Sequence, residues 1–365
     1  MIDNFDIAIV GAGIAGASLA AEIGPHASVV LLEAEDQPGR HSTGRSAAFW
    51  AETYGGPLIQ PLTAASGPWL AERGFLGDRG GLTIARAGQD AEIDRFLGEF
   101  AAAGVRVDRV DRAALEEAIP GLRPEWVAGV TEPGCKDIDV AGLHGWYLAR
   151  ARKAGVRLVC RAELTGAAFA GGKWTLTTAD SAKFGSSILV DAAGAWADPV
   201  AAIAGVRPLG ITPLRRTMVQ LRTSPEASPS LPLVMDILGQ FYFKPEGGRL
   251  WLSPHDEIPS PPCDAAPEEL DVAVAIDRLE HVVDWRIERV EHKWAGLRSF
   301  APDRLPVYGA DPENPAFFWF AGQGGYGIQT APAAARLAAQ IMLDLPADEL
   351  TRGLDPQLYR AARFF

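Results

Sequence analysis

The sequence of 365 residues contains little cysteine and no concentration of positive charge. Its three cysteines, Cys135, Cys160 and Cys263, are odd in number and too far apart for a CxxC pair or a metal knuckle. We therefore expect packing roles in a reducing compartment, and no metal site. Lysine and arginine number 34 against 46 aspartate and glutamate, giving a formal charge of -12. Nucleic acid is not expected as a partner.

The sequence also lacks an uninterrupted apolar run and an export signal. Residues 315–335 carry no charge, but Gln323, Gln329, two prolines and several glycines make them a poor membrane span. Asp3 and Asp6 precede the first apolar run, without a basic region. We expect a cytoplasmic protein without an integral membrane segment.

Strand and helix patterns alternate at both ends of the chain. "DIAIVGAGIAGASLAAEI", residues 6–23, predicts a strand, a glycine turn and a helix, and residues 28–35 predict the second strand of a βαβ unit. Residues 186–206 and 317–345 repeat this order. By contrast, residues 212–292 contain alternating strands broken by proline-rich loops, which indicates a separate antiparallel sheet.

This pattern predicts an α/β protein of two domains. A Rossmann-like nucleotide-binding domain is assembled from the discontinuous segments 1–80, 136–211 and 293–365. An antiparallel-sheet (α+β) domain that binds the substrate is formed by 81–135 and 212–292.

Gly11, Gly13 and Gly16 form a GxGxxG pattern between the first predicted strand and helix. Glycine there lets the backbone turn sharply and approach a pyrophosphate, whose charge the helix N-terminus meets. Glu33 follows about 20 residues after Gly11, where a carboxylate accepts hydrogen bonds from a ribose diol. It would repel a 2'-phosphate. The pattern therefore indicates a dinucleotide, disfavours NADP, and leaves FAD and NAD open.

The segment after Glu33 favours FAD. "AEDQPGRHSTGRSAAFW" continues the chain with small and hydroxylic residues plus Arg40 and Arg45, where a nicotinamide enzyme usually runs directly into its next helix.

Together, GxGxxG, Glu33, "HSTGRSAA", "AAGAW", "WAGLRSF" and "GQGGYGIQT" resemble the D-amino acid oxidase-like family of FAD-dependent amine oxidoreductases, and within it the D-arginine dehydrogenase branch. The likeness covers nearly the whole chain, although residues 80–135 and 222–238 match poorly. It implies non-covalently bound FAD. The residues that it implies as cofactor contacts are Gly11, Gly13, Ile14, Ala15, Gly16, Glu33, Ala34, Ser42, Thr43, Arg45, Ser46, Ala47, Ala193, Gly194, Trp196, Gly296, Gly324, Gly325, Tyr326, Gly327, Ile328 and Gln329.

Carboxylate recognition is the second implication of the resemblance. Arg216 and Arg298 would hold the substrate carboxylate with help from the Tyr242 hydroxyl, since arginine suits a bidentate pair with a carboxylate. Tyr54 would border the pocket, and the Gly325 carbonyl would face the amine. The implied reaction is oxidative deamination of a D-amino acid by hydride transfer from Cα to flavin N5, giving an imino acid and then a 2-oxo acid and ammonia.

Two departures from the family pattern suggest a different side-chain preference. The acidic residue that recognises a cationic substrate aligns near Gly81, and an active-site histidine aligns with Phe49. Both changes remove polar groups, so we expect neutral, apolar or aromatic D-amino acids as substrates. Glu52 is the alternative acid.

Other functions stay open at this stage. A glycine or N-methyl amino acid oxidase, or a 2-hydroxy acid dehydrogenase of the same fold, would use the same arginine. A non-catalytic, flavin-bearing subunit is the alternative of another class. The electron acceptor, whether oxygen, a quinone or an electron-transfer protein, is not indicated by any motif.

Overall fold

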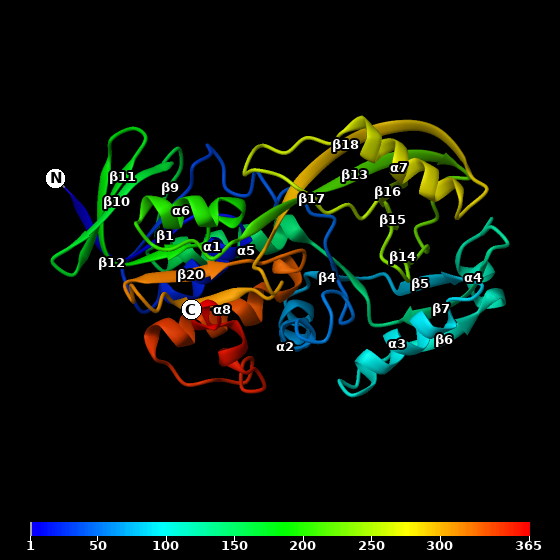
Figure 1. Ribbon diagram of the computed structural model, residues 1–365, viewed down its shortest axis with the longest axis horizontal. Helices are drawn as coiled ribbons and strands as arrows, with labels where there is room; N and C mark the ends of the chain where they lie inside the picture. The colour runs from blue at the N-terminus through cyan, green and yellow to red at the C-terminus, as the bar shows by residue number, and fades with distance from the viewer. Residues whose placement is uncertain (1) are drawn as a thin grey trace.

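The computed structural model describes residues 2–365 and shows two lobes, each built on one large sheet (Figure 1). One lobe carries both ends of the described chain. The other carries the long strands β13 and β18, which reach back toward the first lobe (Figure 1). The cavity described below is lined by residues of both lobes.

The first sheet is the predicted Rossmann-like sheet. Strand β1 is parallel to β2 on one side and to β12 on the other, with Ile7 paired to both Val29 and Ile188. The order along the sheet is β10-β11-β12-β1-β2-β9, and β20 adds to β12 and β19. Its strands are β1 (Asp3–Val10), β2 (Val29–Leu32), β9 (Arg157–Val159), β10 (Leu164–Ala170), β11 (Lys173–Thr178), β12 (Lys183–Asp191), β19 (Val307–Ala310) and β20 (Phe317–Ala321).

Helices cover both faces of this sheet because successive β1 side chains are apolar on both sides. Ile7 and Ile9 belong to the core that includes α1 (Ile14–Ile23), α5 (Val140–Lys153) and α8 (Gly327–Leu343). Ala8 and Val10 belong to the opposite core, against α6 (Ala197–Ile203). Burial on both faces explains the continuous apolar strands and confirms the predicted α/β class.

The second sheet has the order β17-β13-β16-β15-β14-β5-β7-β6, with β18 added to β13. Its strands are β5 (Gly81–Arg86), β6 (Asp108–Asp111), β7 (Trp126–Glu132), β13 (Thr212–Ser224), β14 (Leu233–Asp236), β15 (Tyr242–Glu246), β16 (Arg249–Ser253), β17 (Ile258–Pro259) and β18 (Arg286–Phe300). Helices α3 (Asp90–Ala101), α4 (Arg112–Ala118) and α7 (Glu269–Glu280) accompany it.

The sequence pattern suggested that residues 212–292 form a separate antiparallel sheet. The structure differs, because these residues share their sheet with earlier strands and the sheet is not purely antiparallel. Strand β14 pairs with β5 in parallel, so the sheet is mixed and joins segments far apart in the chain. Nearly 150 residues separate these two strands, so no hairpin constrains their relative direction. Strand β18 also continues past residue 292, where the second segment of the expected substrate domain ends. The proposed domain boundaries remain a proposal.

The remaining elements are short. A three-stranded sheet joins β3 (Phe49–Trp50), β8 (Lys136–Ile138) and β4 (Leu76–Asp78). Helix α2 (Gln60–Glu72) and the 3-10 turns η1 (Gly194–Trp196), η2 (Pro356–Tyr359) and η3 (Ala361–Phe364) complete the fold.

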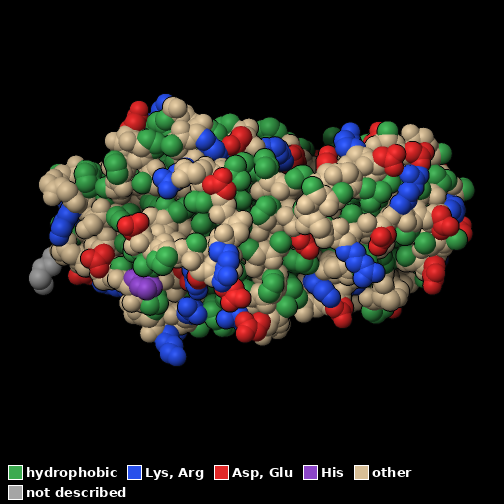
Figure 2. All heavy atoms as spheres, turned by 90° about the horizontal axis from the view of Figure 1, so that it is seen from below, with side chains coloured by type: hydrophobic (Ala, Val, Ile, Leu, Met, Phe, Trp, Pro, Cys, Tyr) green, Lys and Arg blue, Asp and Glu red, His purple; other side chains and the backbone are tan. Residues whose placement is uncertain are grey.

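Acidic and basic side chains are interspersed on the face shown in Figure 2, and neither sign forms a continuous stripe there. Within residues 2–365, no helix has the length and apolarity needed to cross a membrane. The same residues contain no group of three or more His, Cys, Asp or Glu side chains placed to hold a metal ion.

Candidate functional site

The GxGxxG turn is packed too tightly for side chains. Gly11 has φ +97, a conformation that favours glycine, and a Cβ added there would lie 2.6 Å from the Ala192 carbonyl oxygen. A Cβ on Gly16 would lie 1.8 Å from the Gly11 carbonyl oxygen. These two glycines therefore bring β1, α1 and β12 into contact.

The N-terminus of α1 offers donors for an anion. Gly13 provides no side-chain cap, and the Ile14 N–H donates to Thr43 Oγ1 at 3.0 Å. The N–H groups of Ala15 and Gly16 have no acceptor within the helix, as the first turn requires. They are free to meet a negatively charged group together with the helix dipole.

Glu33 is buried at the end of β2 and points back to this turn. Its Oε2 accepts the Ala12 N–H at 2.9 Å, and its Oε1 accepts the Glu35 N–H at 3.0 Å. Each carboxylate oxygen keeps a second lone pair, which suits hydrogen bonds from a diol.

A cavity extends from this region toward the second lobe, with Ile14 and Thr43 at one end and Arg216 and Tyr242 in its lining. Its lining residues are Ile14, Ser42, Thr43, Arg45, Ser46, Ala47, Ala48, Phe49, Tyr54, Arg216, Met218, Tyr242, Gly296, Leu297, Arg298, Gln323, Gly324, Gly325, Gly327, Ile328 and Gln329.

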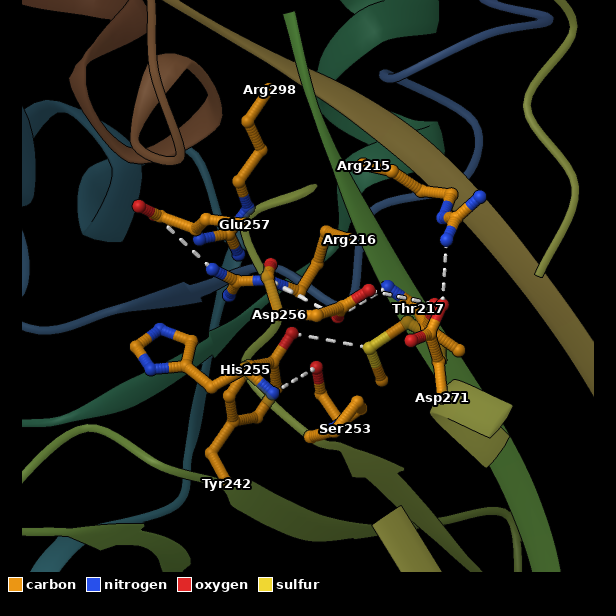
Figure 3. A network of polar contacts seen from close by, with 12 residues as sticks. Arg215, Arg216, Thr217, Tyr242, Ser253, His255, Asp256, Glu257, Asp271 and Arg298 are labelled. Carbon is orange, nitrogen blue, oxygen red and sulfur yellow. Dashed lines mark hydrogen bonds and ion pairs between the residues drawn. The ribbon is translucent and has the colours of Figure 1, made fainter. Parts of the chain in front are cut away.

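Two arginines face this cavity from neighbouring strands. In the antiparallel pair β13 and β18, Arg216 lies opposite Gly296 and Leu214 lies opposite Arg298, which puts both arginines on one face. Figure 3 shows their guanidinium groups side by side. Arg298 Nη1 donates to the Tyr54 hydroxyl.

Arg216 is 4% exposed and only partly neutralised. Its Nε donates to the Asp256 carbonyl at 2.6 Å and its Nη2 to Glu257 Oε1 at 3.3 Å. Its Nη1 is buried and has no hydrogen-bond partner among the described residues. A buried guanidinium with an unused donor beside a second arginine is a site that an anion would stabilise.

The two cations change the protonation of their neighbours. Burial, and then the charges of Arg216 and Arg298, lower the pKa of His255 to about 3, so this ring stays neutral at physiological pH. Burial by itself raises the pKa of Tyr54, but both arginines outweigh it and lower that pKa. The electrostatic field of the pocket therefore favours negative charge.

The wall next to the arginines is apolar. Phe49 packs edge-on against Tyr54 and Tyr242, with ring centroids 4.8 Å and 6.0 Å away. Tyr242 donates its hydroxyl hydrogen to Met218 Sδ at 3.1 Å. The side-chain end of the pocket thus holds aromatic rings and a thioether without an acidic group.

Neither Gly81, where the acidic residue of the family aligns, nor Glu52, the alternative acid, lines this cavity. Gly81 begins β5, where an added Cβ would meet Cys135 and Glu132. Glu52 accepts the Gln60 Nε2 hydrogen at 2.7 Å. Neither residue lines the cavity, so neither supplies a carboxylate to a bound side chain.

Comparison with known proteins supports the family suggested by the motifs. Residues 6–341 match the family model described as FAD dependent oxidoreductase. The chain belongs to this family.

One curated relative and two solved structures are similar to nearly the whole chain. Glycine oxidase from Pseudomonas aeruginosa is 24% identical over 92% of this chain and 94% of its own length. The crystal structure of glycine oxidase from Geobacillus kaustophilus has a TM-score of 0.83 at 23% identity and covers 97% and 100% of the two chains. L-alpha-glycerophosphate oxidase from Mycoplasma pneumoniae, solved with FAD bound, has a TM-score of 0.86 at 18% identity over 94% and 95%.

FAD is the cofactor of this oxidoreductase, and the observed geometry fits it. The α1 N-terminus, whose first residue Ile14 lines the cavity, supplies donors, and the Glu33 carboxylate supplies acceptors next to the same glycine turn. The first turn of α8 adds the N–H groups of Gly327 to Gln329.

Some predicted cofactor residues of the oxidoreductase lie outside the cavity lining. Ala193 donates its N–H to Asp191 Oδ1 at 3.1 Å. Trp196 packs on His41 with ring centroids 4.7 Å apart. The predicted contacts that do not line the cavity are Gly11, Gly13, Ala15, Gly16, Glu33, Ala34, Ala193, Gly194, Trp196 and Tyr326. Their roles as FAD contacts remain predictions.

Sequence reasoning missed several lining residues of the oxidoreductase. Met218 follows Arg216 by two positions in a strand, so the alternation of side chains indicates that both share a face. Ala48 and Leu297 each lie between predicted residues, and Gln323 lies within the predicted glycine turn. His144 was also missed: its Nε2 lies 2.9 Å from the Ala12 carbonyl oxygen and supports the glycine turn. No local pattern links positions 12 and 144.

Proposed function

We propose that the protein oxidises D-amino acids with neutral, apolar or aromatic side chains to imino acids, which hydrolyse to 2-oxo acids and ammonia. The observation that carries the proposal is the pair Arg216 and Arg298, whose charges converge on one apolar-walled cavity, while Arg216 Nη1 has no partner within residues 2–365. The motif likeness described above supports the D configuration.

In this reaction, the chain itself binds and orients the substrate. Arg216 and Arg298 hold the α-carboxylate, and the Tyr54 and Tyr242 hydroxyls border it. A Cβ on Gly325 would lie 2.6 Å from Arg298 Nη1, so glycine at this position leaves room for the guanidinium, and the Gly325 carbonyl would accept a hydrogen from the amine. Bound FAD would supply the acceptor for the two electrons leaving with the Cα hydrogen. Fixing the carboxylate restricts the orientation of Cα, which supplies much of the rate enhancement.

The amine must lose a proton before the nitrogen lone pair can form the imine. His255 stays neutral because its pKa is about 3, so its titration does not affect the profile between pH 6 and 10. We therefore expect kcat/KM to rise with pH over this range as the substrate ammonium deprotonates. Steady-state rates at saturating acceptor measure this. A flat profile would contradict the proposed deprotonation.

The decisive experiment is anaerobic reduction of the bound flavin by a substrate panel. D-phenylalanine, D-leucine and D-methionine are expected to bleach the flavin faster than their L enantiomers and faster than D-arginine or D-lysine. Faster bleaching by D-arginine would overturn the side-chain preference. Preference for the L forms would overturn the configuration.

Oxidation of glycine or an N-methyl amino acid is the second candidate, favoured by the full-length similarity to glycine oxidase from Pseudomonas aeruginosa. The same panel includes glycine, sarcosine and a 2-hydroxy acid. The products that accompany oxidation distinguish these three classes of substrate. Ammonia accompanies deamination, methylamine accompanies sarcosine oxidation, and a 2-hydroxy acid releases neither. Flavin that no compound bleaches would instead indicate a non-catalytic subunit.

A further inference from the structure

Tyr54 belongs to a turn, residues 51–54, that directly follows β3. The Tyr54 N–H donates to the Ala51 carbonyl at 3.2 Å, which closes the turn. The Tyr54 hydroxyl accepts a hydrogen bond from Arg298 Nη1, and its ring packs edge-on against Phe49. The position of this turn therefore decides where the hydroxyl meets the guanidinium of Arg298.

The first lobe holds one side of the turn through Gln329, a residue of α8 that lines the cavity. The Gln329 side-chain oxygen accepts the Ala51 N–H at 3.2 Å, and its Nε2 donates to the Tyr54 carbonyl at 3.1 Å. The same Nε2 donates to Thr63 Oγ1 at 2.9 Å. One amide thus fixes both ends of the turn.

The second lobe holds the other side of the turn through Glu132, the last residue of β7. Glu132 Oε1 accepts the Glu52 N–H at 2.7 Å and the Thr53 N–H at 3.4 Å. Glu132 Oε2 accepts the Thr53 hydroxyl hydrogen at 2.6 Å. These three hydrogen bonds fall on the two residues directly before Tyr54, so Glu132 ties the Tyr54 turn to the sheet of the second lobe.

The carboxylate and the turn depend on each other. Glu132 is 5% exposed, and this burial raises the pKa of its carboxyl. The hydroxyl of Thr53 and the N–H groups of Glu52 and Thr53 act in the opposite direction, because they stabilise the charged form. A turn that moved away would strip a buried carboxylate of these donors, at a cost in free energy that opposes the movement.

The sheet leaves room for Glu132 because its cross-strand neighbour on β5 is Gly81. A Cβ added to Gly81 would lie 3.4 Å from the Glu132 Cβ and 3.1 Å from the Cys135 Cβ. A larger side chain at position 81 would therefore compete with Glu132 for the same space.

We propose that Glu132 is a positioning residue for carboxylate recognition, an inference that rests on the proposed function. Its carboxylate fixes the 51–54 turn, the turn fixes the Tyr54 hydroxyl, and the hydroxyl orients the guanidinium of Arg298. Glu132 itself lies outside the cavity lining, so it acts through Tyr54 and not by contact with the substrate.

The test measures binding of phenylacetate to the FAD-loaded protein through the change in flavin absorbance. Phenylacetate has a carboxylate and an aromatic ring but no amine to oxidise. E132A is expected to keep its FAD and to raise the phenylacetate Kd about tenfold, because the turn loses its second anchor. E132Q keeps an acceptor oxygen for the turn and is expected to stay within about threefold of wild type. E117A, an exposed change on α4, is the matched control and is expected to leave Kd unchanged.

A double-mutant cycle with Y54F shows whether Glu132 acts through the Tyr54 hydroxyl. In the Y54F protein, which lacks this hydroxyl, E132A is expected to change the phenylacetate Kd by less than about twofold. A rise of about tenfold in both backgrounds would overturn the inference, since independent sites add. A lower Tm of E132A with wild-type Kd would show a structural role only and would also overturn it.

T53V replaces E132A if that variant loses FAD. It removes the hydroxyl that Glu132 Oε2 accepts and is expected to raise Kd about threefold. An unchanged Kd in T53V would overturn the inference.

Anaerobic bleaching of the flavin separates the inference from the proposed function. If amino acids bleach the wild-type flavin while E132A binds phenylacetate as tightly as wild type, the inference alone fails. If E132A weakens phenylacetate binding but no amino acid bleaches the wild-type flavin, the proposed function alone fails.

Discussion

Arg298 lines the cavity and donates a hydrogen bond to the Tyr54 hydroxyl. This hydrogen bond holds the guanidinium in place before a substrate binds. Lysine at this position keeps the charge but cannot form the two parallel hydrogen bonds of an arginine–carboxylate pair. We expect R298K to lower kcat/KM for an amino acid by about 30- to 1000-fold, corresponding to about 2–4 kcal/mol.

Steady-state kinetics and the flavin absorbance of the purified variant together measure this effect. R222K, an exposed change on the neighbouring strand β13, is the matched control and is expected to retain activity. Wild-type kcat/KM in R298K with full FAD content would contradict the role assigned to this arginine.

The lowered pKa of His255 predicts that the folded protein becomes less stable as the pH falls. Its folded pKa, about 3, lies below the usual value of 6.5, so the folded state binds fewer protons than the unfolded chain. The stability contributed by the neutral ring is therefore complete above pH 6.5 and is lost as the pH falls toward 3. The slope from this one site is at most about 1.4 kcal/mol per pH unit.

Denaturant unfolding of the FAD-loaded protein at pH 7, 6 and 5 tests this expectation. Wild type is expected to lose stability as the pH falls, and H255N is expected to show a smaller loss. H281N, an exposed histidine on the surface, serves as the control and is expected to follow wild type. Parallel curves for H255N and wild type would show that the ring does not titrate as described.

At the scale of elements, the β1–α1 unit depends on close backbone contact. A Cβ at Gly16 would lie 1.8 Å from the Gly11 carbonyl oxygen, so helix and strand must separate to accept it. We expect G16A to lose bound FAD and to unfold at lower denaturant. G98A is the matched control: Gly98 lies in α3 with open space around it, and alanine there is expected to stabilise by about 0.5–1 kcal/mol.

Both glycine variants are compared by flavin content after purification and by the midpoint of urea unfolding. Retention of stoichiometric FAD by G16A would contradict the assignment of this turn to the pyrophosphate.

Helices and strands could be predicted from the sequence where they depend on residues close together in the chain. The strand, glycine turn and helix at residues 6–23 follow from side-chain periodicity and from the steric limits on non-glycine residues. The parallel pair β5 and β14 could not be predicted this way, because the pairing of distant strands depends on the whole fold. The contact between Thr43 and the start of α1 is also invisible to any local pattern.

At the scale of the molecule, the cofactor cavity is lined by residues from both lobes, so FAD is expected to stabilise the folded chain as a whole. At a free FAD concentration of 100 times its Kd, the stabilisation is about 2.7 kcal/mol. Thermal unfolding of the protein stripped of FAD, with and without added cofactor, measures this. An unchanged Tm after saturation with FAD would show that the cofactor does not bind the folded cavity.

By itself, the sequence determined that residues 6–33 form a strand, a glycine turn, a helix and a second strand, because backbone sterics and side-chain periodicity act over a few residues. Through the family resemblance, it also implied that Arg216 and Arg298 act together. The tertiary structure supplies the physical reason that they line one pocket, which is the register between β13 and β18. The fold likewise excluded Gly81 and Glu52 from the cavity, since long-range packing, and not local preference, sets which side chains face the substrate.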